Sequence, residues 1–204
     1  LQRYVNILSD QREELTNRHW KNIVTREEEK EINLNSPLAQ VVIGVRRSGK
    51  STLCSKVMLE SGLPFGYINF DDDRLGKLTV DAFDTLLRAL YQLNGDFNHL
   101  FLDEVQNIEG WELFVNRMLR QGMHMLITGS NANLLSGELA THLTGRYHQI
   151  VRILAIAGVL YPASITIYLA SSLLRNLSYN GQNVTLSCTL LGDTSKSNTN
   201  PFRS

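Results

Sequence analysis

The sequence predicts an α/β protein, a three-layer sandwich with a parallel sheet between two layers of helices. Three observations predict this class: a glycine-rich loop directly after a short apolar run, a second apolar run that ends in two acids, and an alternation of strand-like and helix-like segments. With 204 residues, 43% of them hydrophobic, the chain is long enough for one full core of this kind.

The glycine-rich loop covers residues 44–51, fits the pattern G-x-x-x-x-G-K-[ST] and follows the apolar run 41–43. In such a loop the backbone N–H groups turn inward around a phosphate, and the following helix directs the positive end of its dipole at the same anion. Lys50 is expected to reach the β- and γ-phosphates, and Ser51 to ligate Mg²⁺. A chance Gly/Ser turn is the competing interpretation, but the motif also needs a strand before it and a helix after it, and both are readable here.

The second apolar run, 99–102, leads into Asp103 and Glu104. In a phosphate-loop protein the Asp of such a pair holds the hydration shell of Mg²⁺, and the Glu polarises the water that attacks the γ-phosphate. Acids at a strand end are also common as solvated turn residues. The phosphate loop upstream favours the catalytic interpretation.

The remaining elements alternate along the chain. We expect strands at 40–44, 66–70, 99–103 and 124–128, and helices at about 50–60, 80–93 and 111–119. The strand at 124–128 leads into Ser130 and Asn131. Either these polar side chains lie near the γ-phosphate and sense it, or they cap a helix that begins near Ala132.

Five segments resemble, in this order, a known family: GVRRSGKSTL, YINFDDDRL, FLDEVQNIEGWELFVNRML, LITGSNANLL and LTGRY. Over about residues 11–150 the chain is similar to prokaryotic AAA-type ATPases, which often carry a C-terminal domain of unknown function. The resemblance implies a P-loop NTPase core of the AAA/ASCE type, with an extra strand between the phosphate-loop strand and the Asp-Glu strand. GTPases and small-molecule kinases fit less well, because the sequence lacks an Asn/Thr-Lys-x-Asp segment and an Arg-rich lid.

The resemblance also assigns roles to residues. ATP would be bound by Gly44, Arg47, Ser48, Gly49, Lys50, Ser51 and Thr52, and Mg²⁺ by Ser51 and Asp103. Glu104 would activate water, and Ser130 or Asn131 would take the sensor position. Arg146 is the candidate arginine finger, or else an exposed charge on the strand that follows it.

Charge and composition bound the partners and divide the chain. The formal net charge is zero, so nucleic-acid binding would need a local patch such as Arg46 and Arg47, which are more simply solvated.

We expect a charged helical segment at 1–35, with Trp20, Ile23 and Val24 on one side, the ATPase core at 36–150, and an atypical tail at 151–204.

The tail holds few charges: 35 of the 40 charged residues lie in the first 151 positions. Residues 153–174 are uncharged and as long as the roughly 20 residues of a membrane-spanning helix, but Pro162 and several Ser and Thr residues weaken that interpretation. We favour a truncated or frame-altered C-terminus over an anchor or a divergent lid, and expect disorder at 194–204.

These expectations combine into a cytoplasmic, Mg²⁺-dependent ATPase that drives a conformational change in an unidentified protein partner or in a missing C-terminal domain. A finger presented to a neighbouring subunit would make it a homo-oligomer. Two alternatives stay open, a nucleotide-gated interaction module with little hydrolysis and a DNA-associated ATPase.

Overall fold

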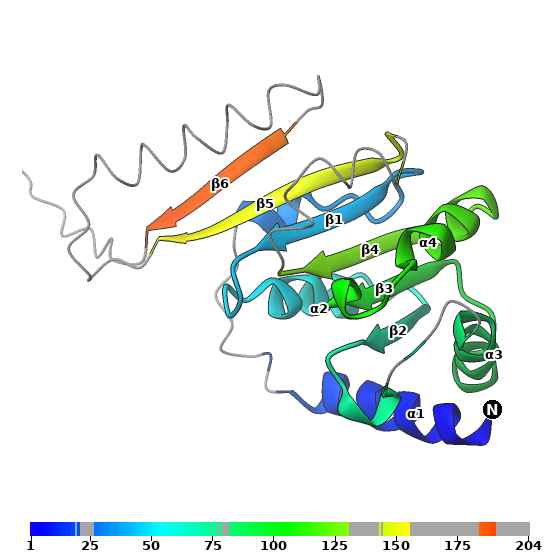
Figure 1. Cartoon of the computed structure of the whole chain (residues 1–204). Coiled ribbons are helices and arrows are strands. Elements are labelled where there is room, and N and C mark those ends of the chain that lie inside the picture. Colours follow the sequence, from blue (N-terminus) through cyan, green and yellow to red (C-terminus); the bar gives the residue numbers. More distant parts are fainter. Residues whose placement is uncertain are drawn as a thin grey trace, which may run out of the picture.

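The computed structural model describes residues 1–18, 20, 27–76, 78, 82–130, 143, 145–155 and 184–190. The elements in chain order are α1 (Gln2–Asn17), η1 (Glu27–Glu31), β1 (Ala39–Gly44), α2 (Lys50–Glu60), β2 (Phe65–Asn69), η2 (Asp73–Leu75), α3 (Ala82–Asn94), β3 (His99–Asp103), η3 (Val105–Asn107), α4 (Trp111–Arg120), β4 (His124–Gly129), β5 (Tyr147–Ala155) and β6 (Val184–Leu190), where η marks a 3₁₀-helix. The described strands form one parallel sheet in the order β2-β3-β4-β1-β5-β6 (Figure 1).

The core strands are buried because helices cover both faces of the sheet. Along β1, Val41 and Ile43 pack into a cluster with residues of α1, α3 and α4, whereas Val42 packs with residues of α2 and with Ile32, which follows η1. The same alternation separates Leu100 and Leu102 from Phe101 in β3, because successive side chains of a strand point to opposite faces. The predicted three-layer α/β fold is confirmed.

Strand β4 lies between β1 and β3, so the extra strand that the resemblance implied is present. In the parallel register Ile127 pairs with Val41 on one side and with Leu102 on the other. The carboxyl ends of β1, β3 and β4 therefore meet at one edge of the sheet. Ligands of open parallel sheets bind outside this edge.

The seven core elements expected from the sequence are found within two residues of their predicted ends. The N-terminal expectation is wrong in one respect, since a single charged helix does not continue to Glu31. Helix α1 ends at Asn17 and Arg18 is extended, with φ −61° and ψ 138°. The indole Nε1 of Trp20 donates to the carbonyl of Leu15 (3.1 Å) and so satisfies a free carbonyl at the helix end.

Helix α1 forms over the part of the N-terminal segment that has an apolar face, and this part precedes the charged stretch. Its buried residues are Val5, Ile7, Leu8, Gln11 and Leu15, and the helix packs against α3 and β2. The Glu-rich segment that follows forms the short η1 instead, where Glu29 pairs with Lys56 of α2 at 2.9 Å. Residues 21–26, which include Ile23 and Val24, lie outside the described residues.

The C-terminal tail contributes the second half of β5 and the whole of β6 at the far side of the sheet. The uncharged stretch begins inside β5, whose residues Ile153 to Ala155 pair with Cys188 to Leu190 of β6. Among the residues that the structure describes, no helix is long and apolar enough to cross a membrane. Residues 156–183 and 191–204, on which the choice between truncation, anchor and lid depends, lie outside the described ranges.

Candidate nucleotide-binding site

The chain turns sharply between β1 and α2, where the phosphate loop was predicted. Gly49 has φ 77°, a left-handed conformation that is strained for a residue with a side chain, and it directly precedes α2. The amide of Ser48 donates to the carbonyl of Val45 (3.2 Å), while its buried hydroxyl makes no hydrogen bond within the described residues. A phosphate group in the loop would give this hydroxyl a partner, so the loop fits the predicted anion.

Lys50 begins α2 and its side chain is buried across the mouth of the loop. Its Nζ donates to the carbonyl of Val45 (3.1 Å) and lies 3.9 Å from Oε1 of Glu104. Burial lowers the pKa of Lys50, and the carboxylates of Glu104 and Asp103 oppose this shift. A phosphate would bring further negative charge to this amine and favour its protonated form.

Asp103, the last residue of β3, is buried among hydroxyl groups. Ser51 Oγ donates to its Oδ1 (2.8 Å), and Thr128 Oγ1 donates to the same oxygen. Burial raises the pKa of Asp103, and these two hydrogen bonds act in the opposite direction. Mg²⁺ ligands lie about 2.0–2.1 Å from the metal in octahedral geometry, so adjacent ligand oxygens are about 2.9 Å apart. The Ser51 and Asp103 oxygens fit that spacing.

Glu104 follows β3 in a left-handed conformation, with φ 54° and ψ 49°. Its amide donates to Thr128 Oγ1 (3.1 Å), so Thr128 contacts both acids. Its Oε2 accepts hydrogen bonds from Ser130 Oγ (2.8 Å) and from Gln106 Nε2 (2.5 Å). Of the two residues proposed as sensors, Ser130 therefore contacts the candidate base, and Asn131 lies outside the described residues.

Sequence reasoning missed Thr128 and Gln106. Thr128 lies at the end of the apolar run of β4, and the neighbouring strand β3 ends at Asp103 and is followed by Glu104. Only the strand order, with β4 beside β3, brings the Thr128 hydroxyl to Asp103. Gln106 lies two residues after Glu104, and its proximity follows from the 3₁₀ turn of η3. A polar residue at the end of each strand was the available signal for Thr128.

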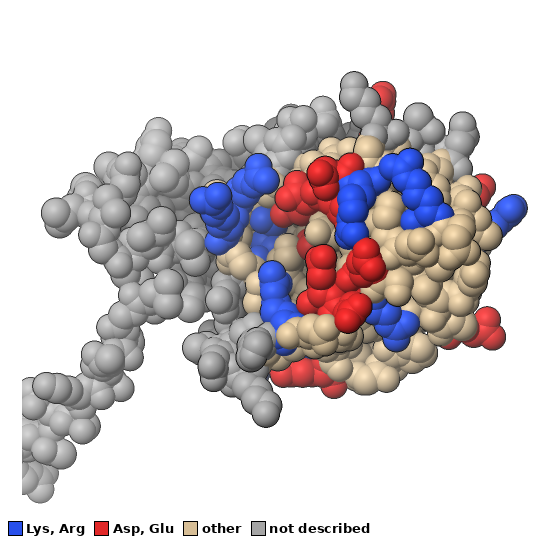
Figure 2. Space-filling view, turned by 90° about the horizontal axis from the view of Figure 1, so that it is seen from below, with Lys and Arg blue, Asp and Glu red and all other residues tan. Residues whose placement is uncertain are grey.

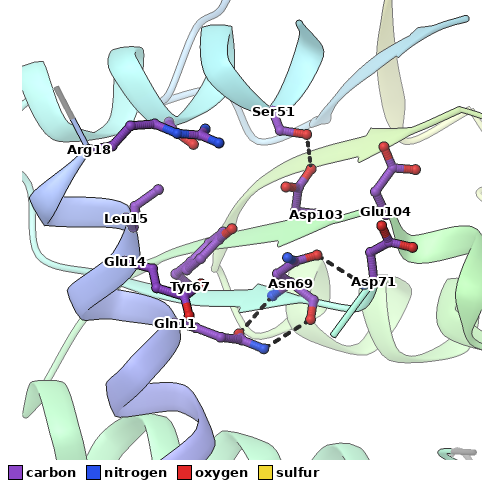
Figure 3. Close-up of a pocket in the computed structure, with 11 residues that line it drawn as sticks. Gln11, Glu14, Leu15, Arg18, Ser51, Tyr67, Asn69, Asp71, Asp103 and Glu104 are labelled. Atoms are coloured by element: carbon purple, nitrogen blue, oxygen red, sulfur yellow. Dashed lines mark hydrogen bonds between the residues drawn. The ribbon is translucent and has the colours of Figure 1, made fainter. Parts of the chain in front are cut away.

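A cavity of about 230 Å³ adjoins Ser51, Asp103 and Glu104 on the side of β2 (Figure 3). Its other walls come from α2, from β2 with its following loop, and from the C-terminal half of α1 with the residue after it. They are lined by Ser55, by Tyr67, Asn69 and Asp71, and by Gln11, Glu14, Leu15 and Arg18. Burial and the nearby Asp103 raise the pKa of the Tyr67 hydroxyl, which stays protonated. Helix α1 thus forms part of the site, next to the position expected for Mg²⁺.

The two loop arginines are exposed, and one of them contacts a residue that lines the cavity. Arg46 forms an exposed ion pair with Asp71 (3.6 Å), and Arg47 is exposed with φ 64°. Figure 2 shows Lys and Arg residues alternating with Asp and Glu residues around a hollow on one face, not a continuous basic patch. Such a mixed surface agrees with the zero net charge.

Arg146 lies away from these residues, at the opposite edge of the sheet. Its carbonyl accepts from the amide of Ala39 at the start of β1, and Ala39 pairs with Tyr147. At about 3.3 Å per residue, the length of β1 puts Arg146 roughly 16 Å from the phosphate loop of its own chain. Arg146 therefore cannot contact a phosphate bound in the same chain, and Thr144 lies outside the described residues.

The strand order, together with the loop that joins β1 to α2, defines the class of the protein, a nucleotide-binding domain with the P-loop NTPase fold. The chain belongs to the AAA domain family, whose model matches residues 36–158.

Two relatives share the core sequence. An uncharacterized protein of Methanocaldococcus jannaschii is 38% identical over 117 residues, which cover 57% of this chain and 26% of that protein. An uncharacterized protein of Haemophilus influenzae is 38% identical over 120 residues, which cover 54% of this chain and 30% of that protein. The chain thus spans about a quarter to a third of the length of these relatives.

Solved structures with a similar arrangement are more distant. A Pif1 helicase from Candida albicans gives a TM-score of 0.41 at 14% identity, covering 64% of this chain and 40% of the helicase chain. The flagellar accessory protein FlaH from Methanocaldococcus jannaschii gives 0.40 at 14% identity, covering 63% of this chain and 78% of that chain.

Proposed function

We propose that this chain binds ATP with Mg²⁺ and hydrolyses it. The observation that carries the proposal is the meeting of Lys50, Ser51, Asp103 and Glu104 at the carboxyl edge of the sheet, through contacts of 2.8 to 3.9 Å. A cation, a metal-binding pair and a carboxylate that can accept a proton are the groups that phosphoryl transfer to water requires.

Each residue has a separate task in this proposal. The loop amides and Lys50 would bind the β- and γ-phosphates, and Lys50 would exchange the Val45 carbonyl for phosphate oxygens. Ser51 and Asp103 would hold Mg²⁺, which supplies charge neutralisation on the phosphoryl oxygens when bound. Glu104 would orient a water molecule and take its proton. Thr128 would keep both acids in place through its single hydroxyl.

The test begins with Lys50→Ala. Removing the cation should abolish binding of a fluorescent ATP analogue and phosphate release, while the circular dichroism spectrum stays that of the wild type. Arg120→Ala, an exposed cation at the end of α4, serves as the matched control and should bind normally. Unchanged affinity in Lys50→Ala would refute the site.

Steady-state phosphate release separates hydrolysis from the second candidate function, a nucleotide-gated interaction module. Tight ATP binding without release above the Lys50→Ala background would favour the module. Stimulation of release by DNA would favour a DNA-associated ATPase. The proposal also includes the role of the whole protein. ATP turnover in the cytoplasm would drive a conformational change in a protein partner or in a further domain.

A further inference from the structure

The 3₁₀ turn after β3 brings a neutral amide against the candidate base. Val105 is fully buried and fixes η3 on the core, while the amide of Asn107 donates to the carbonyl of Glu104 (3.2 Å) and closes the turn. Because Val105 faces the core, the side chain of the next residue, Gln106, turns back and contacts the carboxylate of Glu104. The turn geometry therefore sets which residue meets the carboxylate.

Three side chains then close a ring of hydrogen bonds. Gln106 Nε2 donates to Glu104 Oε2 (2.5 Å) and to Ser130 Oγ (3.2 Å), and its Oε1 accepts from the amide of Ser130 (3.3 Å). Ser130 Oγ completes the ring by donating to Glu104 Oε2 (2.8 Å). The amide of Gln106 uses its donor and acceptor groups together, a pattern that an apolar side chain of the same length cannot reproduce.

The ring treats the two carboxylate oxygens differently. Oε2 of Glu104 receives both hydrogen bonds, whereas Oε1 faces Lys50 Nζ at 3.9 Å, on the side of the phosphate loop. A general base needs one free oxygen directed at the water, and a base misplaced by about 1 Å can lose on the order of 10²-fold in rate. We propose that Gln106 is a positioning residue that, with Ser130, fixes the Glu104 carboxylate so that Oε1 points to the attacking water.

This inference rests on the proposed ATPase function, and its test uses a double-mutant cycle. Gln106→Met keeps the side-chain length without the amide, and Gln106→Ala removes both. In the wild-type background each should lower kcat for ATP by about 10- to 100-fold with KM within about twofold, because only the orientation of the base changes. In the Glu104→Gln background the same changes should have no further effect in single-turnover hydrolysis, because no base is left to position.

Asn107→Ala is the matched control. The side chain of Asn107 lies on the same turn, but its Nδ2 donates to the carbonyl of Phe70 (3.2 Å) and not to Glu104. This variant should leave kcat near the wild-type value. An unchanged kcat in both Gln106 variants, an equal loss in both backgrounds, or a loss of ATP binding would each overturn the positioning role while wild-type turnover stands. Failure of the proposed function looks different, because wild-type protein would then release no more phosphate than Lys50→Ala, and the inference would fall with it.

Discussion

The two acids at the end of β3 are adjacent in the chain but differ in surroundings. Asp103 is buried, accepts hydroxyl donors and lies beside Ser51, whereas Glu104 is partly exposed and its Oε1 faces the amine of Lys50. A carboxylate among hydroxyl oxygens suits a metal, and one near the phosphate loop suits a water molecule. These surroundings fit the separate tasks that we propose for the two residues.

Conservative amide variants test this division. Glu104→Gln should keep ATP affinity and slow hydrolysis by on the order of 10²-fold or more, the usual scale for loss of a general base. Asp103→Asn should instead lose the dependence of ATP binding on Mg²⁺, measured by calorimetry with and without the metal. If both variants lose Mg²⁺-dependent binding alike, the assignment of separate tasks is incorrect.

His99 gives a residue-scale prediction about stability. It begins β3 at the edge opposite the site, is buried, and stacks on His124 with ring centroids 4.8 Å apart. Burial, and then the neighbouring His124, lower the pKa of His99 from its usual 6.5. Just below pH 6.5 the unfolded chain therefore binds more protons than the folded protein, so the free energy of unfolding should decrease as pH falls through 6.5 towards the lowered pKa.

Urea denaturation between pH 7.5 and about 5 measures this slope, which His99→Phe should flatten because the ring no longer titrates. His148→Gln is the control, since His148 contacts Gln40 elsewhere at this edge (3.1 Å). A slope that survives in His99→Phe would assign the pH dependence to another group.

At the scale of elements, α1 completes the edge of the sheet as well as the cavity. Strand β2 is an edge strand, and Gln11 hydrogen-bonds it as a neighbouring strand would: the amide of Asn69 donates to Gln11 Oε1 (2.9 Å), and Gln11 Nε2 donates to the Asn69 carbonyl (3.1 Å). Nε2 also reaches Asp72 (2.9 Å). Helix α1 thus satisfies backbone groups beside the candidate metal site.

Gln11→Ala should therefore lower the free energy of unfolding by about 1–3 kcal/mol, the cost of leaving buried polar groups without partners. Gln2→Ala, on the exposed start of the same helix where Gln2 bonds only Asn6 among the described residues, should change it little. Chemical denaturation of both variants provides the comparison. Equal stabilities would show that water replaces the amide of Gln11.

At the scale of the whole molecule, the position of Arg146 limits how it could act. It lies at the amino edge of the sheet, one strand length from its own phosphate loop, so a finger role requires a second copy of the chain. A guanidinium suits the charge that develops on the γ-phosphoryl oxygens, and such fingers contribute about 10³ to 10⁵ in rate.

Arg146→Ala should then bind ATP but hydrolyse it poorly. Mixing it with Glu104→Gln protein should restore some phosphate release, because a mixed interface pairs an intact Glu104 with an intact Arg146. Full activity of Arg146→Ala alone would remove the finger role. Loss without rescue on mixing would identify a structural arginine, since action within one chain is excluded by the sheet geometry.

The sequence by itself determined the core elements, the phosphate loop and the two acids, because these depend on local signals. Apolar runs and helical periodicity predict strands and helices from neighbouring residues, and Gly49 allows the left-handed turn at its own position. Only the tertiary structure decided which distant groups meet. Thr128 reaches Asp103 because β4 lies beside β3, and Gln11 reaches β2 because α1 packs across the edge of the sheet.

Tertiary structure also decided that Arg146, the candidate arginine finger, lies far from the phosphate loop of its own chain. Its motif is local, but its distance from the phosphate loop depends on the parallel pairing of β5 with β1, a contact between segments about 100 residues apart. Strand order arises from packing of the whole sheet and is not encoded in any single segment. The sequence therefore identified the candidate site residues, and the fold determined which of them lie close enough together to act on one nucleotide.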